Sequence, residues 1–422
     1  MNPPSNKLSR RQLLRAAVVI FAARRPRIAM GSTSEEKLPP IRQVTSGPRF
    51  HWFGYYDKLQ FDPTGRYLLS MEVDFEHRSP RPDDVVKVGM IDLADGDRWI
   101  ELDQTTAWCW QQGCMLQWLP GSASEILWND RDGDHFVCHI LDVKTRTKRT
   151  IPHPVYTVSP AGRWAVAPDF GRLNDMRPGY GYPGVPDSHR DELTPRDSGI
   201  YRIDLATGRQ ELIIRLADVA RIPHPRGDLS GMKHYFNHLL VNPDGTRFEF
   251  FDLWMDGKKM IARMLTAAAD GTDVRMLDPT GDTSHFFWRD PKHILAWSSQ
   301  PQGDGFYLFE DKTGGTVEQI GKGVMLPEDG HCTYLPGNRW ILCDTYPDRQ
   351  RYQNVYLYNI ALNQRVPLGH FYSPPRYGGE WRCDTHPRFS PDGRSVVIDS
   401  PHTGQGRQLH LIDIRRLIQD RD

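Results

Sequence analysis

A short turn built on proline recurs seven times along the chain, and no other feature of the sequence restricts the fold as strongly. Each copy connects two apolar segments, as in Phe61-Asp62-Pro63-Thr64-Gly65-Arg66-Tyr67. Proline fixes φ for a turn, and a following glycine or asparagine takes the left-handed conformation, so the pattern predicts a β-hairpin at each copy. The prolines of the seven copies are Pro63, Pro120, Pro160, Pro243, Pro291, Pro336 and Pro391.

A second alternating segment follows each copy and predicts a second hairpin. These segments are 88–93, 137–142, 200–205, 260–264, 306–309, 355–358 and 409–413. Two hairpins make a four-stranded sheet, so the sequence predicts an all-β fold, a seven-bladed β-propeller of four-stranded blades, for residues 35–422. The composition agrees, because 36 Gly and 33 Pro suit many short strands and turns, and 12 Trp supply a core.

One interval between the turn prolines is much longer than the others. Pro160 and Pro243 are 83 residues apart, whereas the other intervals are 40 to 57 residues. We assign the excess to an insertion at about 170–198, whose segment Arg177-Pro178-Gly179-Tyr180-Gly181-Tyr182 is rich in turns and aromatic side chains. Long loops on such scaffolds often carry function, so we expect an ordered lid over one end of the propeller.

The first 34 residues differ from the rest in charge. They carry seven basic residues and no acid, which leaves the remainder of this neutral chain with a net charge of −7. Arg10-Arg11 before a short apolar stretch resembles a twin-arginine export signal and predicts a periplasmic or secreted protein; the alternative is an amphipathic basic helix. The acidic remainder has no general attraction to nucleic acid, and no apolar run is long enough for a membrane span in the mature protein.

Four histidines occupy equivalent positions when the blades are aligned on their turn prolines. His238, His285, His331 and His386 each precede the turn by five or six residues, on four successive blades. The innermost strands of a propeller line its axis, so these side chains converge, and imidazoles are good ligands for divalent metals. Asp384 shares a strand face with His386 and is a further ligand or an orienting group. Two alternatives stay open: structural histidines, and a stabilising zinc site that uses the neighbouring Cys332 or Cys383.

The other blades supply a mixed polar and aromatic rim at the same end. The candidates are His51, Tyr55, Tyr56, Asp57 and Lys58 from blade 1, Gln111 and Gln112 from blade 2, and Tyr156 from blade 3, with Arg172 entering from the insertion. Guanidinium groups pair with carboxylates and aromatic faces pack on sugar rings, so this rim suits an acidic oligosaccharide or polysaccharide.

These residues resemble the seven-bladed propeller polysaccharide lyases, meaning the oligogalacturonate lyases and the related ulvan-type and rhamnose–glucuronate lyases. The resemblance is sharpest at 53–58, 177–182, 237–238, 284–285 and 384–387. In the oligogalacturonate branch it implies that His238 is the base and that a metal binds His285 and His386, although this chain has Asp384 and Trp381 where the family has histidine and glutamine. In the ulvan-type branch it implies catalysis by Tyr156 and Arg172, without the upstream histidine pair of that branch.

We therefore expect a carbon–oxygen lyase that cleaves a uronic-acid-containing glycan by β-elimination with a divalent metal, manganese or zinc. Catalytic candidates are His238, Tyr156, Arg172 and Tyr180; substrate-binding candidates are Arg177, Tyr56, Lys58 and Gln112; metal-ligand candidates are His285, His331, Asp384 and His386. The rival hypothesis is a non-catalytic periplasmic propeller that binds or scaffolds and holds a structural metal. A serine peptidase is disfavoured, because no Gly-x-Ser-x-Gly motif is present.

Overall fold

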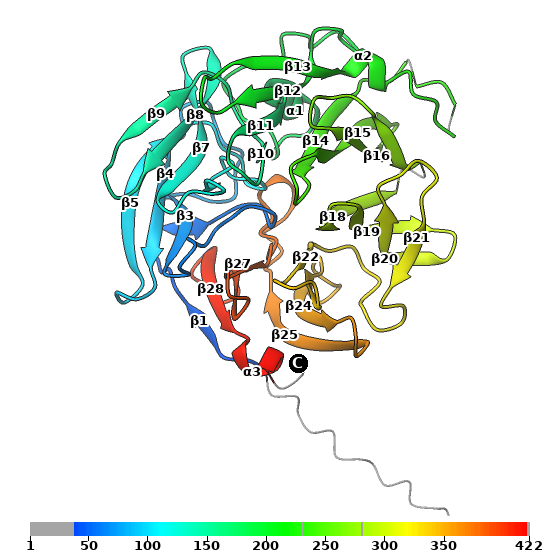
Figure 1. Cartoon of the computed structure of the whole chain (residues 1–422). Coiled ribbons are helices and arrows are strands. Elements are labelled where there is room, and N and C mark those ends of the chain that lie inside the picture. Colours follow the sequence, from blue (N-terminus) through cyan, green and yellow to red (C-terminus); the bar gives the residue numbers. More distant parts are fainter. Residues whose placement is uncertain (1–37, 226, 230, 280–281, 420–422) are drawn as a thin grey trace, which may run out of the picture. The chain divides into compact units, whose positions relative to one another are not determined.

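Seven four-stranded antiparallel sheets surround a central axis in the computed structural model (Figure 1). The structure describes residues 38–225, 227–229, 231–279 and 282–419, so the leader expected at 1–34 lies outside the described residues. All seven sheets belong to one unit, Leu38–Asp422. The prediction of an all-β, seven-bladed β-propeller is confirmed.

Blades 1 to 6 are each built from four consecutive strands. Blade 1 consists of β2 (Phe50–Trp52), β3 (Tyr67–Val73), β4 (Val86–Asp92) and β5 (Arg98–Thr105). Blade 2 consists of β6 (Gln117–Trp118), β7 (Glu125–Asp132), β8 (His135–Asp142) and β9 (Lys148–Ile151). Blade 3 consists of β10 (Thr157–Val158), β11 (Trp164–Pro168), β12 (Gly199–Asp204) and β13 (Gln210–Arg215).

The next three blades repeat this order. Blade 4 consists of β14 (Tyr235–Val241), β15 (Arg247–Asp256), β16 (Lys259–Ala268) and β17 (Arg275–Asp278). Blade 5 consists of β18 (Thr283–Asp290), β19 (His293–Gln300), β20 (Gly303–Glu310) and β21 (Val317–Ile320). Blade 6 consists of β22 (Cys332–Tyr334), β23 (Trp340–Asp344), β24 (Tyr352–Asn359) and β25 (Gln364–Tyr372).

Blade 7 closes the ring with strands from both ends of the unit. Its strands β26 (Arg388–Phe389), β27 (Ser395–Ser400) and β28 (Gln408–Asp413) come from the C-terminal part, and its fourth strand is β1 (Ile41–Gln43), which pairs with β28. The sequence repeat did not predict this pairing, because it depends on a contact between the two ends. The joint stabilises the ring, since hydrogen bonds rather than a loop connect the first and last blades.

The turn prolines act as the sequence pattern predicts. In the first copy, the Gly65 N–H donates to the Asp62 carbonyl at 2.9 Å, and in the last copy the Gly393 N–H donates to the Ser390 carbonyl at 2.8 Å. Both glycines have φ near +70°, at +73° and +68°, a conformation that residues with a Cβ rarely adopt. The alternating segments that follow coincide, to within one residue, with parts of β4, β8, β12, β16, β20, β24 and β28.

Two insertions, not one, account for the long interval between Pro160 and Pro243. The first lies between β11 and β12 and begins with helix α1 (Phe170–Met176), where only a loop was expected at 170–198. The Asp169 carboxylate caps this helix by accepting from the Arg172 N–H at 3.0 Å, and Phe170 and Leu173 pack into the core. The second insertion follows β13 and contains α2 (Leu216–Val219).

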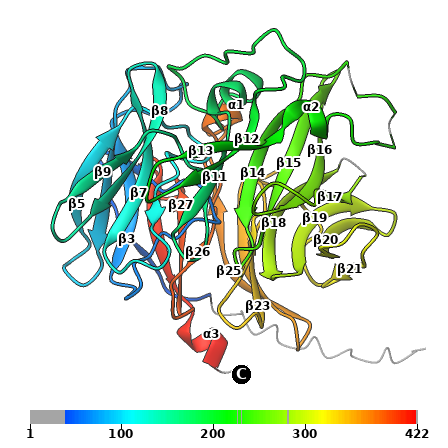
Figure 2. The same ribbon diagram turned by 45° about the horizontal axis from the view of Figure 1, so that its top comes forward.

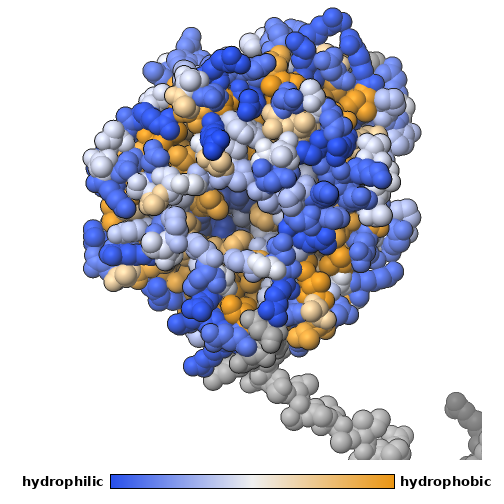
Figure 3. Space-filling view, viewed as in Figure 1, coloured by the Kyte–Doolittle hydropathy of each residue, from blue (hydrophilic) through white to orange (hydrophobic). Residues whose placement is uncertain are grey.

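The two insertions mark one end of the ring. Figure 2 shows α1 and α2 at the top, and the C-terminal helix α3 (Arg415–Gln419) at the opposite end. A 3₁₀ turn, η1 (Gly379–Trp381), precedes β26. Figure 3 shows one face of the ring, with mainly hydrophilic side chains around a hollow near its centre. Among the residues described, no helix combines the length and apolarity that a membrane span requires.

Candidate functional site

The four aligned histidines lie close together near the axis. His238 belongs to β14 and His285 to β18, whereas His331 directly precedes β22 and His386 precedes β26. The ring centroids of His285 and His331 are 4.0 Å apart, and those of His331 and His386 are 4.3 Å apart. The ring of His238 lies 6.3 Å from that of His285. Blades 4 to 7 therefore each contribute one imidazole to a single cluster.

Two of these histidines have unusual backbone conformations. His238 has φ of +55° and lies in an irregularity of β14 between Asn237 and Leu240, where the register with β15 shifts. His386 has φ of +39°. A residue with a Cβ is destabilised at positive φ, and such strain persists where surrounding contacts enforce it, often at functional sites. A bulge also redirects the side chain at its position, which explains how His238 leaves the regular alternation of the strand.

Three of the predicted metal ligands can reach one ion. One ligand atom each from His331, Asp384 and His386 lies within 4.8 Å of the others. His331 Nε2, His386 Nε2 and Asp384 Oδ1 are buried, and each lacks a hydrogen-bond partner in the described part of the chain. Burying an unpaired polar atom is costly, and two imidazole nitrogens with a carboxylate oxygen are a donor set that manganese and zinc accept. These residues therefore fit a divalent metal.

Carboxylates orient the histidines of the cluster. His331 Nδ1 lies 2.9 Å from Asp344 Oδ1, and His285 Nδ1 lies 2.9 Å from Asp329 Oδ1. A carboxylate on Nδ1 leaves Nε2 for a metal, which is the usual arrangement of metal-binding histidines. His331 Nε2 has no partner among the described residues, whereas His285 Nε2 lies 3.4 Å from the Tyr346 hydroxyl. Burial alone would lower the pKa of His331, but the Asp344 carboxylate holds that pKa above its ordinary value. Burial lowers the pKa of His285 despite the opposing carboxylate of Asp329.

His238 is held between a phenol and a guanidinium. The Tyr55 hydroxyl lies 2.6 Å from His238 Nδ1, and Arg177 Nη1 donates toward His238 Nε2 at 3.2 Å. A guanidinium can only donate, so Nε2 carries the lone pair and Nδ1 carries the proton. Burial, and next the positive charge of Arg177, lower the pKa of His238 well below its ordinary value. This imidazole is therefore neutral near pH 7 and has the protonation state of a general base.

A pocket of about 240 Å³ opens beside His238 and His285. Arg177, Asp329 and Tyr346 supply its polar wall, and Phe251, Leu253, Met260 and Ala262 supply an apolar wall. Arg177 is half-buried with its guanidinium carbon 3.7 Å from the Tyr180 ring centroid, and it forms no ion pair with any residue that the structure describes. The pocket thus offers one unneutralised cation to an anionic ligand.

Arg382 connects the metal-ligand group to the first insertion. Its Nε donates to Asp384 Oδ2 at 2.6 Å, and its Nη2 donates to the Tyr180 hydroxyl at 2.6 Å. The ring centroids of Tyr180 and His238 are 5.7 Å apart. The structure therefore brings Tyr180 and Arg177, both predicted site residues, to the histidine cluster.

Four other predicted residues are buried near this cluster. The Tyr56 hydroxyl donates to the Phe286 carbonyl at 2.8 Å, and Lys58 Nζ donates to Asp57 at 2.7 Å and lies 4.8 Å from the Tyr156 ring centroid. The Tyr156 hydroxyl accepts from Gln112 Nε2 at 2.7 Å. None of these four side chains lines the 240 Å³ pocket. Tyr56 and Gln112 contact the cluster itself, at His331 and His238, and the catalytic or substrate-binding roles expected of these four residues stay predictions.

Arg172 points away from the cluster, in contrast to the catalytic role expected for it. It is 1% exposed, and its guanidinium donates to Asp187 and to the carbonyls of His189, Glu192, Leu193 and His234 at 2.6–3.2 Å. These bonds occupy the donors that a substrate carboxylate would need. The sequence separation between Tyr156 and Arg172 suggested a shared site. Helix α1 instead directs the Arg172 side chain into the insertion, where its hydrogen bonds connect the loop to His234, directly before β14.

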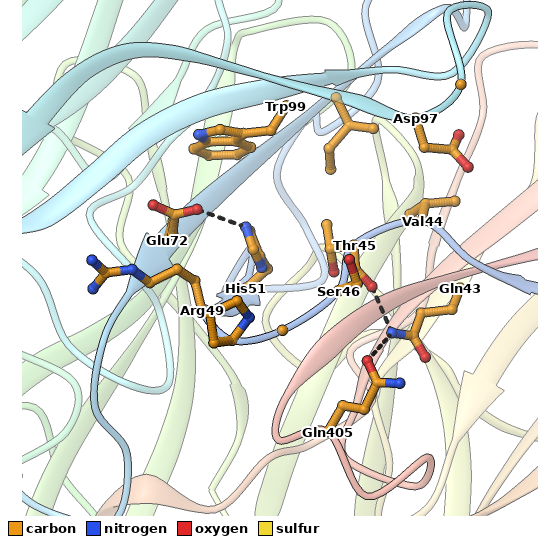
Figure 4. A pocket seen from close by; sticks show the side chains of 14 residues that line it. Gln43, Val44, Thr45, Ser46, Arg49, His51, Glu72, Asp97, Trp99 and Gln405 are labelled. Carbon is orange, nitrogen blue, oxygen red and sulfur yellow. Dashed lines mark hydrogen bonds and ion pairs between the residues drawn. The ribbon is translucent and has the colours of Figure 1, made fainter.

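A larger pocket, of about 610 Å³, lies at the seam between blades 7 and 1 (Figure 4). His51, which the sequence placed on the rim of the site, lies here instead and contacts Glu72 at 3.1 Å through Nε2. The cations Arg42 and Arg49 are paired with Asp97 and Asp74. This pocket shares no lining residue with the smaller pocket, and its balanced charges do not favour an anionic ligand.

Sequence reasoning missed Asp329, Asp344, Tyr346 and Arg382. Asp329 lies two positions before His331, and Arg382 lies two positions before Asp384. Side chains two positions apart share one face of an extended chain, so this spacing could have indicated both residues. Asp344 and Tyr346 gave no such signal, because Asp344 ends the second strand of blade 6, Tyr346 follows it, and both meet the cluster only through folding. The cysteine alternative is not supported, since Cys332 and Cys383 are outside the three-residue group and unbridged within the described chain.

Comparison with known proteins supports the fold. No protein-family model matches the sequence, and no curated protein is similar to it in sequence. The structure is similar to an oligogalacturonate lyase from Vibrio parahaemolyticus, with 14% identity and a TM-score of 0.64 over 90% of this chain and 95% of that chain. An oligogalacturonate lyase in complex with manganese gives 15% identity and a TM-score of 0.64, over 89% and 93% of the two chains.

Propeller peptidases also match, at lower similarity. A puromycin-hydrolyzing peptidase from Mycobacterium tuberculosis has 14% identity and a TM-score of 0.48 over 86% of this chain and 52% of that chain. Identities in this range establish a shared fold only. The protein is therefore a seven-bladed β-propeller with a buried histidine and carboxylate cluster at its axis.

Proposed function

We propose that this protein is a lyase that cleaves a uronic-acid-containing glycan by β-elimination, and that the 240 Å³ pocket is its active site. The observation that carries the proposal is the neutral His238, whose Nε2 lone pair faces an unpaired guanidinium at the wall of this pocket. Elimination from a uronate needs these two elements: a cation for the carboxylate and a neutral base for the adjacent carbon acid.

Arg177 binds the uronate carboxylate in this scheme. Without a ligand its guanidinium donates to His238 Nε2; a carboxylate competes for that donor and releases the lone pair of the base. A charge-assisted hydrogen bond to a carboxylate is stronger than one to a neutral imidazole. Substrate binding therefore frees the base at the moment when the substrate is in place.

The proton transfers use His238 in the wall of the pocket and Tyr180, whose ring centroid lies 5.7 Å from that of His238. His238 Nε2 takes the proton from the carbon next to the carboxylate, and that electron pair forms a double bond to the neighbouring ring carbon. The glycosidic C–O bond on that carbon breaks, and its oxygen takes a proton from Tyr180. The Tyr180 oxygen already accepts from Arg382, which leaves its own proton free and stabilises the phenolate. Each positioned acid or base contributes about 10²–10⁴-fold.

The cluster of His331, Asp384 and His386 would hold the divalent metal. A bound cation at this place would supply positive charge to stabilise the enediolate that develops on the uronate. The fold neighbour solved with manganese supports a divalent metal as the ligand. Manganese and zinc both suit the donor set.

The proposal is tested by the ultraviolet absorbance of the conjugated double bond that elimination creates. The mature protein is incubated with pectic, ulvan-type and rhamnose–glucuronate glycans, with and without chelator. A rise in absorbance that His238→Ala abolishes supports the lyase. Metal-dependent thermal stability without any rise on this panel would overturn it and favour the non-catalytic scaffold.

Export through a twin-arginine signal is a separate proposal that rests on Arg10 and Arg11. A reporter fused after the first 50 residues would reach the periplasm of a bacterial host. Replacing both arginines with lysine should abolish this export, while export that persists in the variant would contradict the proposal.

A further inference from the structure

Arg382 lies between two parts of the molecule that the chain separates widely. Asp384 belongs to the segment before β26, and Tyr180 belongs to the insertion between β11 and β12. One guanidinium donates to both, through Nε to Asp384 Oδ2 and through Nη2 to the Tyr180 hydroxyl, each at 2.6 Å. The donors of a guanidinium are fixed in one plane, so these two bonds set the positions of the two oxygens relative to each other.

The bond to Asp384 decides which oxygen faces the metal ligands. Because Oδ2 accepts from Arg382, only Oδ1 is left, and this atom finds no partner elsewhere in the described chain. The Asp384 side chain is 1% exposed and that of Arg382 is 24% exposed. A buried ion pair that is broken on one side leaves an uncompensated charge, so the orientation of Asp384 depends strongly on Arg382.

The backbone around Arg382 is held by other blades. Gln111 of blade 2 donates through Nε2 to the carbonyls of Glu380 and Arg382, at 2.8 and 3.1 Å. Arg407 of blade 7 donates through Nη2 to the carbonyl of Trp381 at 2.9 Å. The Gln111 N–H also donates to the carbonyl of Gly179 in the insertion, at 3.2 Å. The guanidinium is therefore presented from a rigid support.

We propose that Arg382 is a positioning residue that couples the metal-ligand group to the proton donor Tyr180. It holds Asp384 Oδ1 toward His331 and His386, and it holds the Tyr180 hydroxyl beside His238. Metal binding and the conformational order of the insertion that carries Tyr180 are thereby linked, because Asp384 and Tyr180 accept hydrogen bonds from the same guanidinium. This inference rests on the proposed function for the role of Tyr180, whereas the role toward Asp384 is independent of it.

Three variants test the two bonds separately and together. Arg382→Lys places one point charge near Asp384 but cannot span both oxygens, so Mn²⁺ and Zn²⁺ affinity by titration calorimetry should stay within about threefold of wild type while kcat falls. Arg382→Met removes both bonds and should weaken metal affinity about 10- to 100-fold, as the loss of an orienting partner does. Tyr180→Phe should keep the metal affinity and lower kcat more than it changes KM.

A matched control and a second readout complete the test. Arg376→Met removes an exposed arginine of the same loop and should change neither metal affinity nor kcat. Amide hydrogen exchange at 177–184 should rise in Arg382→Met and on removal of metal from wild type. Wild-type metal affinity in a folded Arg382→Met variant would overturn the inference, even if no glycan were cleaved.

Discussion

The Tyr55 hydroxyl lies 2.6 Å from His238 Nδ1 and fixes which nitrogen of this imidazole is available for chemistry. Arg177 donates to Nε2 from the opposite side, so Tyr55 accepts the Nδ1 proton. Blade 1 supplies the phenol and blade 4 the imidazole, and both side chains are buried. The lone pair of His238 therefore points into the pocket without a rearrangement of the ring.

Removal of the Tyr55 hydroxyl should lower kcat. Tyr55→Phe leaves the Nδ1 proton of His238 without an acceptor, which costs about 1–3 kcal/mol, and the ring can change tautomer. We expect kcat to fall about tenfold or more, with little change in KM. Tyr352→Phe, which removes the hydroxyl of an exposed tyrosine on blade 6, is the control. Wild-type kcat in Tyr55→Phe would reject the role of this contact.

The positive charge of Arg177 should control the acid side of the pH profile. Burial first and Arg177 second lower the pKa of His238, and a base works only when it is neutral, so kcat/KM of the wild type should fall only well below pH 6.5. Arg177→Met removes the second-largest cause of the lowered pKa and should move this acid limb to higher pH.

Arg177→Lys serves as the control for this profile. It keeps the charge and should keep the position of the acid limb, although the substrate binds less well because a lysine cannot pair bidentately. An acid limb at the same pH in Arg177→Met and wild type would show that His238 is not the titrating base.

The three-residue group should account for most of the metal binding. Asp384→Ala and His386→Ala each remove one of the three atoms that lie within 4.8 Å of one another, and both should lose bound Mn²⁺ and the thermal stabilisation that it gives. His285→Ala should weaken binding less, because His285 is outside the group and its Nδ1 contacts Asp329. Metal analysis of the purified variants checks this ranking of metal loss. Equal losses of metal in all three variants would contradict it.

Arg172 should matter for folding rather than for catalysis. Arg172→Met removes its bonds to the insertion and leaves the buried Asp187 carboxylate without its guanidinium partner, at a cost of about 3–5 kcal/mol. The melting temperature should fall by several degrees, whereas kcat of the folded variant should stay near that of wild type. Arg163→Met, at an exposed turn of the same blade, is the matched control. A large loss of kcat without loss of stability would restore the catalytic assignment.

Blade 7 should make the protein sensitive to acid. Burial, and next the neighbouring His402, lower the pKa of His410 from 6.5 to about 3. The unfolded chain then binds a proton that the folded chain excludes, so stability is lost as the pH falls from 6.5 toward 3. The loss from this group is about 2 kcal/mol at pH 5. His410→Gln should flatten the decline in melting temperature between pH 7 and pH 5; an unchanged slope would contradict this origin.

The sequence by itself determined the architecture and the existence of the histidine cluster. Each Pro-containing turn is specified by neighbouring residues, through the fixed φ of proline and the positive φ of Gly65 and its equivalents. Seven such turns give seven blades, and equivalent positions on adjacent inner strands must meet at the axis. His238, His285, His331 and His386 could therefore be aligned from the chain alone.

Only the tertiary structure decided what each side chain does at that place. The direction of Arg172 depends on helix α1, the direction of His238 depends on a bulge, and the free oxygen of Asp384 depends on Arg382. The pairing of β1 with β28 likewise joins the two ends of the unit. The contacts of Arg172 and of β1 link residues far apart in sequence. Arg382 and Asp384 are only two residues apart, but Gln111 and Arg407 hold the backbone around Arg382 from other blades. No local pattern encodes this packing.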